Sequence, residues 1–220
     1  MQARVGDGGR LASVSGAGLD SGRLASVSGA VLVGGASSRM GRDKALLELE
    51  GVAWATRVGR VLASLVGDVL LVGGSPPAEA PGRRVADPEG PVCALRGLVA
   101  ALAEARAPRV LVVATDLPLV TPDLLLALVA WPEADAVIPR GEAGPHPLCG
   151  LYRREPVLAV ARQQLAAGRL KLQELLEAVD TSWFGPEQLA HVDPDGLALQ
   201  NLNTPEDLTR LQALLHGRRG

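Results

Sequence analysis

Two cations and a pair of glycines stand close together near the start of the chain, and their spacing suits the binding of a polyphosphate. Gly34 and Gly35 follow a short apolar run, and Arg39 and Lys44 come a few residues later. Because glycine has no Cβ and adopts positive φ, backbone N–H groups in such a turn can approach an anion closely. The lysine does not directly follow a glycine, so the segment is not a P-loop, and it lacks the G-x-G-x-x-G spacing. The alternative is an ordinary turn between a strand and a helix, with two solvated cations.

A carboxylate follows the clearest strand of the sequence. Residues 109–114 form a continuous apolar run with β-branched residues, which predicts a buried central strand, and Asp116 comes just after it. Ligands of parallel sheets bind outside the carboxyl ends of the strands, where a carboxylate can hold Mg²⁺ against phosphate oxygens. On position alone, Asp116 could equally end the strand in a turn. Asp87 has a similar alternative, as an acid that stabilises the N-terminus of the following helix.

Three further polar residues stand out in the second half of the chain. His146 lies between two prolines, which predict a rigid turn, and a lone histidine is usually structural or exposed. Asn201 and Asn203 precede Thr204 and Pro205, which suit the N-cap and the first position of a last helix. Capping explains the threonine and the proline without any function, but it does not require the two asparagines.

Apolar runs of strand length alternate with longer helical patterns along the chain. This alternation predicts βαβ units and an α/β fold with a parallel sheet. The expected strands are 30–33, 68–72, 109–114, 135–139 and 145–152. The expected helices are 52–65, 92–105, one that starts after Thr121 as N-cap, 156–167 and 168–179.

The N-terminal segment contains a repeat. Residues 7–17 are nearly repeated by residues 20–30, at a period of 13, and glycine and serine dominate both copies. Two copies are too few for a solenoid. We therefore expect residues 1–28 to form a mobile extension and residues 29–220 to form a single domain.

The composition limits the remaining classes of function. The chain has 220 residues, enough for one domain with a sizeable core, and its net charge of −2 gives no reason to expect a nucleic acid or a membrane surface as partner. Its two cysteines, Cys93 and Cys149, are far apart, so neither a disulfide framework nor a zinc site is indicated. Without a transmembrane run or a signal-peptide pattern, the expected location is cytoplasmic.

Four motifs give the chain a resemblance to a known family. Residues 32–44 meet every fixed position of the signature L-x-G-G-x-x-x-R-M-G-x-D-K of the molybdenum cofactor guanylyltransferases, which belong to the MobA-like nucleotidyltransferases. The family's C/T-D-x-P motif is matched at 115–118, its H-P-x-x-x-x-x-x-R run at 146–154, and its N-x-N-T-P-E-[DE]-L motif at 201–208. Around Asp87 the match is partial, because residues 92–94 depart from the family's G-P-L-A-G.

This resemblance implies a three-layer α/β/α sandwich with a Rossmann-like, mostly parallel sheet of the nucleotide-diphospho-sugar transferase type. It implies that GMP is transferred from GTP to the phosphate of molybdenum-molybdopterin, giving the guanine dinucleotide cofactor and pyrophosphate, with Mg²⁺ as metal. The expected partners are these substrates and, transiently, proteins that make molybdopterin or receive the product. We expect a monomer that contacts neither nucleic acid nor membrane.

The resemblance also implies roles for individual residues. Lys44 would stabilise charge on the α-phosphate, Arg39 would hold the β- and γ-phosphates, and Asp116 would bind Mg²⁺. The implied nucleotide contacts are Leu32, Val33, Gly34, Gly35, Lys44, Val72, Asp87 and Asp116. The implied contacts to the acceptor substrate are His146, Asn201 and Asn203.

Three alternatives stay open at this stage. A related cytidylyl branch usually shows Ala-Gly where this chain has Gly34 and Gly35, and some guanylyl enzymes carry an asparagine where it has Val72. Cytidylyl transfer to molybdopterin, or nucleotidyl transfer to another phosphorylated alcohol or sugar, is therefore the alternative within this class. A non-catalytic module that binds GTP or the cofactor is disfavoured, because Arg39, Lys44 and Asp116 are all present.

Overall fold

The computed structural model describes residues 21–33, 46–86, 89–90, 93–202, 207 and 210–211. In these residues a sheet of eight strands has the order β10-β7-β9-β6-β1-β4-β5, with β8 paired to β7. Its strands are β1 (Val27–Leu32), β4 (Val69–Val72), β5 (Arg83–Val85), β6 (Arg109–Ala114), β7 (Ala136–Gly141), β8 (Gly144–Pro145), β9 (Cys149–Arg153) and β10 (Thr181–Phe184). A separate two-stranded sheet joins β2 (Glu48–Leu49) and β3 (Val52–Ala53).

The large sheet is mostly parallel, as the sequence predicts. Strands β5, β4, β1 and β6 run parallel to one another, whereas β9 pairs antiparallel with both β6 and β7. In the central register Leu32 is opposite Val72 on one side and opposite Ala114 on the other. The carboxyl ends of β1, β4 and β6 therefore meet at one edge of the sheet.

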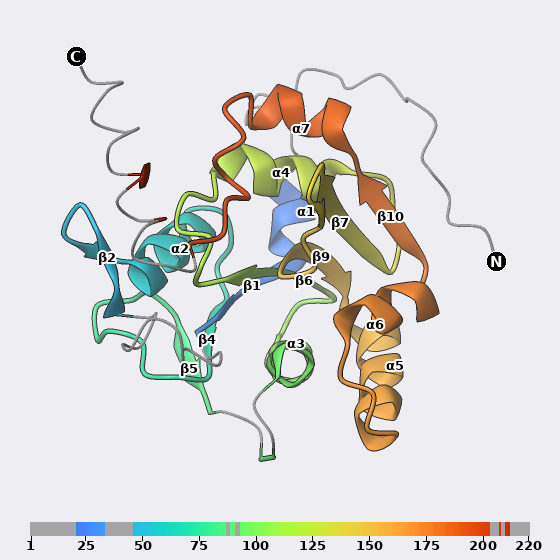
Figure 1. Cartoon of the computed structure of the whole chain (residues 1–220). Coiled ribbons are helices and arrows are strands. Elements are labelled where there is room, and N and C mark those ends of the chain that lie inside the picture. Colours follow the sequence, from blue (N-terminus) through green and yellow to red (C-terminus); the bar gives the residue numbers. More distant parts are fainter. Residues whose placement is uncertain are drawn as a thin grey trace.

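Helices cover both faces of the sheet (Figure 1). They are α1 (Ser21–Ala25), α2 (Trp54–Ala63), α3 (Ala94–Glu104), α4 (Pro122–Ala130), α5 (Arg154–Ala166), α6 (Leu172–Ala178) and α7 (Pro186–Val192). Side chains of α2, α4 and α7 pack in one core cluster with Val31, and those of α3, α5 and α6 pack in another with Ala30 and Leu32. Since successive strand residues point to opposite faces, β1 contributes to both cores. The predicted three-layer sandwich is confirmed.

Two local predictions agree closely with the structure. Strand β6 has the predicted bounds, and all of its residues after Arg109 are buried. Helix α4 begins after Thr121, whose side chain accepts a hydrogen bond from the backbone N–H of Leu124 at 3.3 Å. This cap gives a hydrogen-bond acceptor to one backbone N–H of the first turn that has no partner within the helix.

The folded part of the chain begins earlier than residue 29. Helix α1 and the first two residues of β1 lie in the segment that we expect to be a mobile extension; the earlier part of that segment lies outside the described residues. The Oγ of Ser28, a buried side chain, donates to Oδ2 of Asp68 at 2.7 Å and accepts from the backbone N–H of Ala107 at 3.1 Å. These long-range bonds fix the second copy of the repeat to the sheet, and composition alone does not reveal them.

Four other segments differ from the expected pattern. Helix α2 starts at Trp54 because the two preceding residues pair with β2, which shortens the expected helix 52–65. The expected strand 145–152 is divided into β8 and β9 by a turn in which the N–H of Cys149 donates to the carbonyl of His146. Strand β10 and helix α7 are not predicted from the sequence at all.

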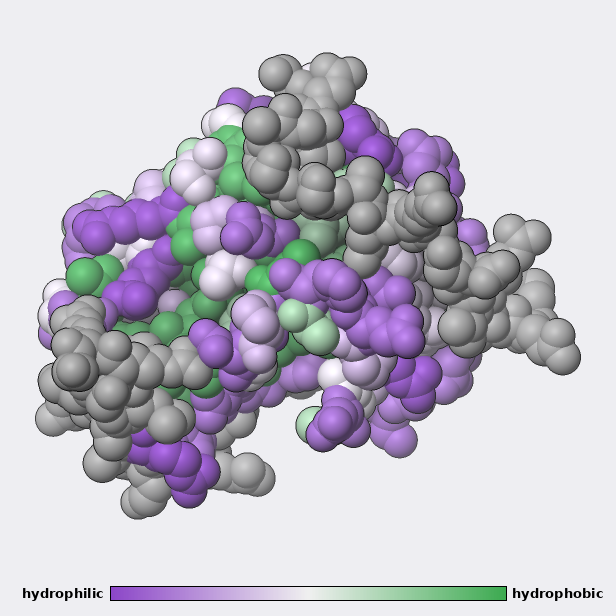
Figure 2. All heavy atoms as spheres, turned by 90° about the horizontal axis from the view of Figure 1, so that it is seen from above, coloured by the Kyte–Doolittle hydropathy of each residue, from purple (hydrophilic) through white to green (hydrophobic). Residues whose placement is uncertain are grey.

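Three further features of the fold concern its surface, its two cysteines and the lengths of its helices. Figure 2 shows that hydrophilic residues surround a band of hydrophobic surface on one face of the protein. Cys149 is fully buried, which raises the pKa of its thiol to about 12, and Cys93 is half-buried; neither forms a disulfide. Among the described helices, none has the length and apolar character needed to cross a bilayer.

Candidate active site at the carboxyl edge of the sheet

Hydrogen bonds bind the ends of three central strands together at the carboxyl edge. The N–H of Val33, the residue after β1, donates to the carbonyl of Val72 at 2.9 Å. The N–H of Thr115, the residue after β6, donates to the carbonyl of Leu32 at 3.1 Å. The segment that continues from Val33 into the glycine-rich motif therefore starts from a fixed position between β4 and β6.

Thr115 contributes a second bond at this edge that the sequence motif does not reveal. Its side chain is buried, and its Oγ1 donates to the same carbonyl of Leu32 at 2.8 Å. Both hydrogen bonds act on the residue directly before Asp116 and so fix where β6 ends relative to β1. Thr115 is a positioning residue, and a threonine before a candidate metal ligand is the signal that could have identified it.

Asp116 lies half-buried at the carboxyl end of the central strand, as predicted. Its backbone carbonyl accepts a hydrogen bond from the N–H of Leu202 at 2.9 Å. Leu202 is fully buried, and Asn201 immediately before it is exposed. The structure thus brings the asparagine segment from the end of the chain against the aspartate that follows β6.

His146 is close enough to Asp116 for the two side chains to affect each other's charge. Burial lowers the pKa of His146 below its usual value, and the negative charge of Asp116 opposes this effect in part. The imidazole is therefore mainly neutral at pH 7. Its backbone is fixed by the bond from its N–H to the carbonyl of Pro139 at 2.8 Å. Two residues that are thirty positions apart in the sequence thus lie near enough for their charges to interact at the predicted edge.

The apolar members of the predicted nucleotide set are buried. Leu32, Val33 and Val72 are 6%, 3% and 2% exposed, so their side chains belong to the cores. The carbonyls of Leu32 and Val72 already accept the bonds described above. A nucleotide contact at these positions stays a prediction and would have to use the backbone.

Two glycines after β4 form part of the same edge. Gly73 and Gly74 have φ values of +73° and +55°, which side chains rarely adopt. A Cβ at Gly74 would lie 3.2 Å from the carbonyl oxygen and 3.0 Å from Cγ1 of Val33. A turn that crosses the end of β1 this closely requires glycine at this position.

The other predicted site residues lie outside the described residues, namely Gly34, Gly35, Arg39, Lys44, Asp87 and Asn203. For a metal, Asp116 is the described candidate ligand at this edge. No group of three or more His, Cys, Asp or Glu side chains arranged for a metal ion occurs in the described part of the chain. Such an edge can hold a metal ion that takes most of its ligands from phosphates and water, as Mg²⁺ commonly does.

Comparisons with known proteins agree with this geometry. Residues 29–182 match the family model described as the MobA-like NTP transferase domain. The "Probable molybdenum cofactor guanylyltransferase" of Chloroflexus aggregans is 38% identical over 193 residues, covering 84% of this chain and 92% of the relative. The protein with the same description from Pelotomaculum thermopropionicum is 31% identical over 194 residues, covering 86% and 93%.

A solved structure gives the same result for the fold. The molybdopterin-guanine dinucleotide biosynthesis protein A from Archaeoglobus fulgidus superimposes with a TM-score of 0.73 at 25% sequence identity, covering 86% of this chain and 99% of the other. The similarity thus extends over nearly the whole of each relative. The resemblance that the four sequence motifs indicate is confirmed.

Proposed function

We propose that this chain, which belongs to the family of MobA-like NTP transferases, transfers GMP from GTP to the phosphate of molybdenum-molybdopterin and releases pyrophosphate. The observation that carries the proposal is that the segment of Asn201 bonds to the backbone of Asp116, and that His146 lies within electrostatic reach of this aspartate, at the carboxyl edge of the sheet. Three motifs from distant parts of the sequence converge where ligands of such sheets bind.

The reaction is a nucleotidyl transfer. An oxygen of the pterin phosphate attacks the α-phosphorus of GTP in line, a new P–O bond forms, and the bond to the β-phosphate oxygen breaks as pyrophosphate leaves. The protein does little covalent chemistry in such a step, so positioning and charge stabilisation supply the catalysis. In the proposed scheme Lys44 stabilises the charge on the α-phosphate, and Arg39 with the backbone of residues 34–41 holds the β- and γ-phosphates.

Asp116 would hold Mg²⁺ in this scheme. When bound, the ion supplies positive charge to the phosphate oxygens of GTP. The protein's own role is to keep this carboxylate in place. Thr115 donates a hydrogen bond to the end of β1, and the backbone N–H of Leu202 donates one to the Asp116 carbonyl. His146, mainly neutral beside this carboxylate, adds no second positive charge that would compete with the metal.

The remaining site residues would recognise the two substrates. The carboxylate of Asp87 can accept hydrogen bonds from N1 and N2 of guanine, with the backbone of residues 32–34 beside the nucleotide. His146, Asn201 and Asn203 would contact the acceptor. Within the same proposal the enzyme acts as a monomer in the cytoplasm, in transient contact with the proteins that supply molybdopterin or receive the product.

Two variants with a matched control test the assignment of Asp116 and Lys44. Asp116→Asn should raise the Mg²⁺ concentration needed for half-maximal pyrophosphate release by at least about tenfold, because a charged ligand is lost. Lys44→Ala should lower kcat more than it weakens GTP binding, since its charge acts on the α-phosphate. Asp123→Asn removes the same charge from the exposed start of α4 and should change neither quantity. The roles are wrong if Asp116→Asn keeps the wild-type Mg²⁺ dependence, or if Lys44→Ala keeps kcat while GTP affinity collapses.

A further inference from the structure

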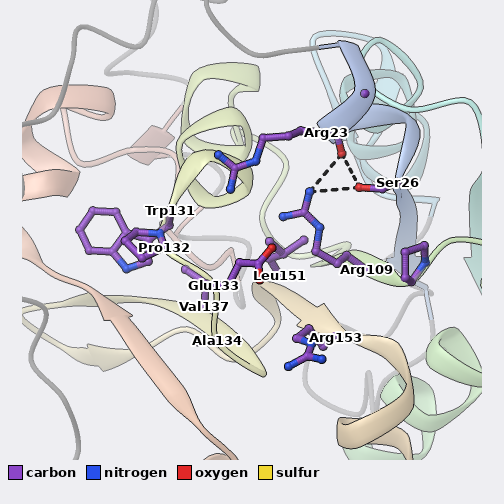
Figure 3. Close-up of a pocket in the computed structure, with 12 residues that line it drawn as sticks. Arg23, Ser26, Arg109, Trp131, Pro132, Glu133, Ala134, Val137, Leu151 and Arg153 are labelled. Carbon is purple, nitrogen blue, oxygen red and sulfur yellow. Dashed lines mark hydrogen bonds between the residues drawn. The ribbon is translucent and has the colours of Figure 1, made fainter.

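A cavity of about 390 Å³ lies at the opposite edge of the sheet from the candidate active site (Figure 3). It is formed where α1, the start of β6, the end of β9 and the segment after α4 meet. Three arginines, Arg23, Arg109 and Arg153, line it together with one acid, Glu133. We call this cavity, with these four residues, the arginine pocket.

The arginine pocket is separate from the carboxyl edge. Arg109 is the first residue of β6, and Asp116 is the second residue after its end, so the two sites are separated by the length of the strand. Six residues of strand span about 20 Å, which exceeds the Debye length of about 8 Å at physiological ionic strength. A ligand in the arginine pocket would therefore not touch the groups proposed for nucleotidyl transfer.

Within the described part of the chain, two of the three guanidinium groups have no carboxylate partner. Nη2 of Arg109 donates to the carbonyl of Arg23 at 3.1 Å and to Oγ of Ser26 at 3.2 Å. Nη1 of Arg23 donates to the carbonyl of Ala130 at 3.4 Å. Among the residues that the structure describes, neither Arg23 nor Arg109 forms an ion pair within 4.0 Å. Their positive charges are thus held close together by neutral acceptors.

The electrostatic state of Arg109 reflects this arrangement. Burial lowers the pKa of its guanidinium, the charge of Arg23 lowers it further, and Glu133 opposes both effects. Figure 3 shows that the three arginines come from different elements: the Arg23 and Arg109 side chains lie above Glu133 in this view, and the Arg153 side chain lies below it. An anion in the pocket would relieve the repulsion between two like charges in a partly desolvated position.

The lining also indicates what kind of anion fits. Three arginines and one glutamate give the wall a net charge of +2, which Asp135 offsets in part through its ion pair with Arg153 at 3.1 Å. The rest of the wall is largely apolar and includes Pro108, Trp131, Pro132, Val137 and Leu151. A phosphate monoester carries a charge of about −1.5 to −2 at pH 7 and matches the fork geometry of guanidinium groups.

We propose that the arginine pocket binds a small phosphate monoester, with the phosphate among Arg23, Arg109 and Arg153 and a compact ring against Trp131 and its apolar neighbours. Gly22, Arg23 and Ser26 form one wall of the pocket and precede residue 29, where the match to the family model begins. The proposal does not depend on the nucleotidyl transfer proposed above.

Calorimetric titration of the full chain with phenyl phosphate tests this site, with inorganic phosphate and phenol as the two halves of the probe. Phenyl phosphate should bind with 1:1 stoichiometry and more tightly than either half. Arg23→Gln and Arg153→Gln should each weaken binding at least about tenfold, the loss expected for one charge-assisted hydrogen bond. Arg162→Gln, an equal loss of charge on the exposed face of α5, should leave the affinity within about twofold.

A fourth variant separates this pocket from the phosphate-binding edge. Lys44→Ala should leave phenyl phosphate binding unchanged if the probe occupies the arginine pocket. If Lys44→Ala abolishes binding while Arg23→Gln and Arg153→Gln keep it, the probe sits at the carboxyl edge and the proposal is wrong. Absence of any saturable heat would also overturn it, because Arg109 would then serve only to hold α1 against β6. Circular dichroism of each variant checks that the fold is retained.

Discussion

Replacing Thr115 by valine tests whether the buried hydroxyl positions Asp116. Valine keeps the shape of the side chain but removes the bond from Oγ1 to the carbonyl of Leu32 at 2.8 Å. That carbonyl retains the bond from the Thr115 N–H at 3.1 Å, so it is not left unsatisfied. The expected loss is the net value of one hydrogen bond, about 1 kcal/mol. For a domain of this size that corresponds to a melting temperature lower by about 2–4 °C.

Stability alone does not separate a positioning role from a packing role, so Thr115→Ser is the matched control. Serine keeps the hydroxyl and loses a buried methyl group, which costs about 1 kcal/mol as well. Both variants should therefore melt at similar temperatures. Only Thr115→Val should release the end of β6 from β1. It should lower kcat, or raise the Mg²⁺ concentration needed for half-maximal activity, by several-fold, since small displacements of a catalytic group have large effects on rate.

The assay is pyrophosphate release at saturating GTP over a Mg²⁺ titration, with melting followed by circular dichroism on the same samples. The reasoning fails if Thr115→Val has wild-type kcat and Mg²⁺ dependence. It fails equally if Thr115→Ser loses as much activity as Thr115→Val, because the hydroxyl would then not be the group that matters.

Three further changes follow from other contacts. Gly74→Ala should lower the free energy of unfolding, measured in urea, by more than Gly51→Ala does. Both glycines have a positive φ, which costs an alanine about 1–2 kcal/mol, but only a Cβ at position 74 would press against Val33. Asp68→Asn should destabilise the protein by about 1–2 kcal/mol at pH 7, because burial raises the pKa of the Asp68 carboxyl but its hydrogen bonds outweigh that effect and lower it. This contribution of the wild type is present above pH 3.8, so the difference in stability between the two proteins should disappear as the pH falls through the folded-state pKa. The pKa of His146 is lowered in the folded state, so the unfolded chain binds more protons than the folded protein just below pH 6.5. The wild type should therefore lose stability on acidification in this range. A plot of the free energy of unfolding against pH should show a smaller slope there for His146→Gln.

The parts of the fold that local sequence determines could be predicted well. Strand β6 is a continuous apolar run in a parallel sheet, and helix α4 has a threonine cap followed by proline, so both have the expected positions. Asp116 could be placed at the carboxyl edge for the same reason, since it follows that strand. The order of strands and helices, rather than any single residue, determines the three-layer sandwich.

Features that depend on distant contacts could not be predicted. The second repeat copy looks like a flexible linker by composition, but Ser28 bonds to Asp68, 40 positions away, and orders it. The hydroxyl of Thr115 bonds to Leu32 across 83 positions, and the pairing of β3 with β2 shortens α2 at its start. The approach of His146 to Asp116 needs the turn before β9, which no periodicity in the sequence indicates.

The measurement that tests the central claim most directly is pyrophosphate release with Mg²⁺ and molybdenum-loaded molybdopterin, with GTP, CTP, ATP and UTP offered in parallel. We expect turnover with GTP alone, dependent on the acceptor and lost in Lys44→Ala. Turnover with CTP in place of GTP would contradict the assignment of the guanylyl reaction while keeping the fold and the site. Silence with all four nucleotides, in a protein that still binds GTP, would contradict the enzyme itself and favour a module that only carries the nucleotide or the cofactor.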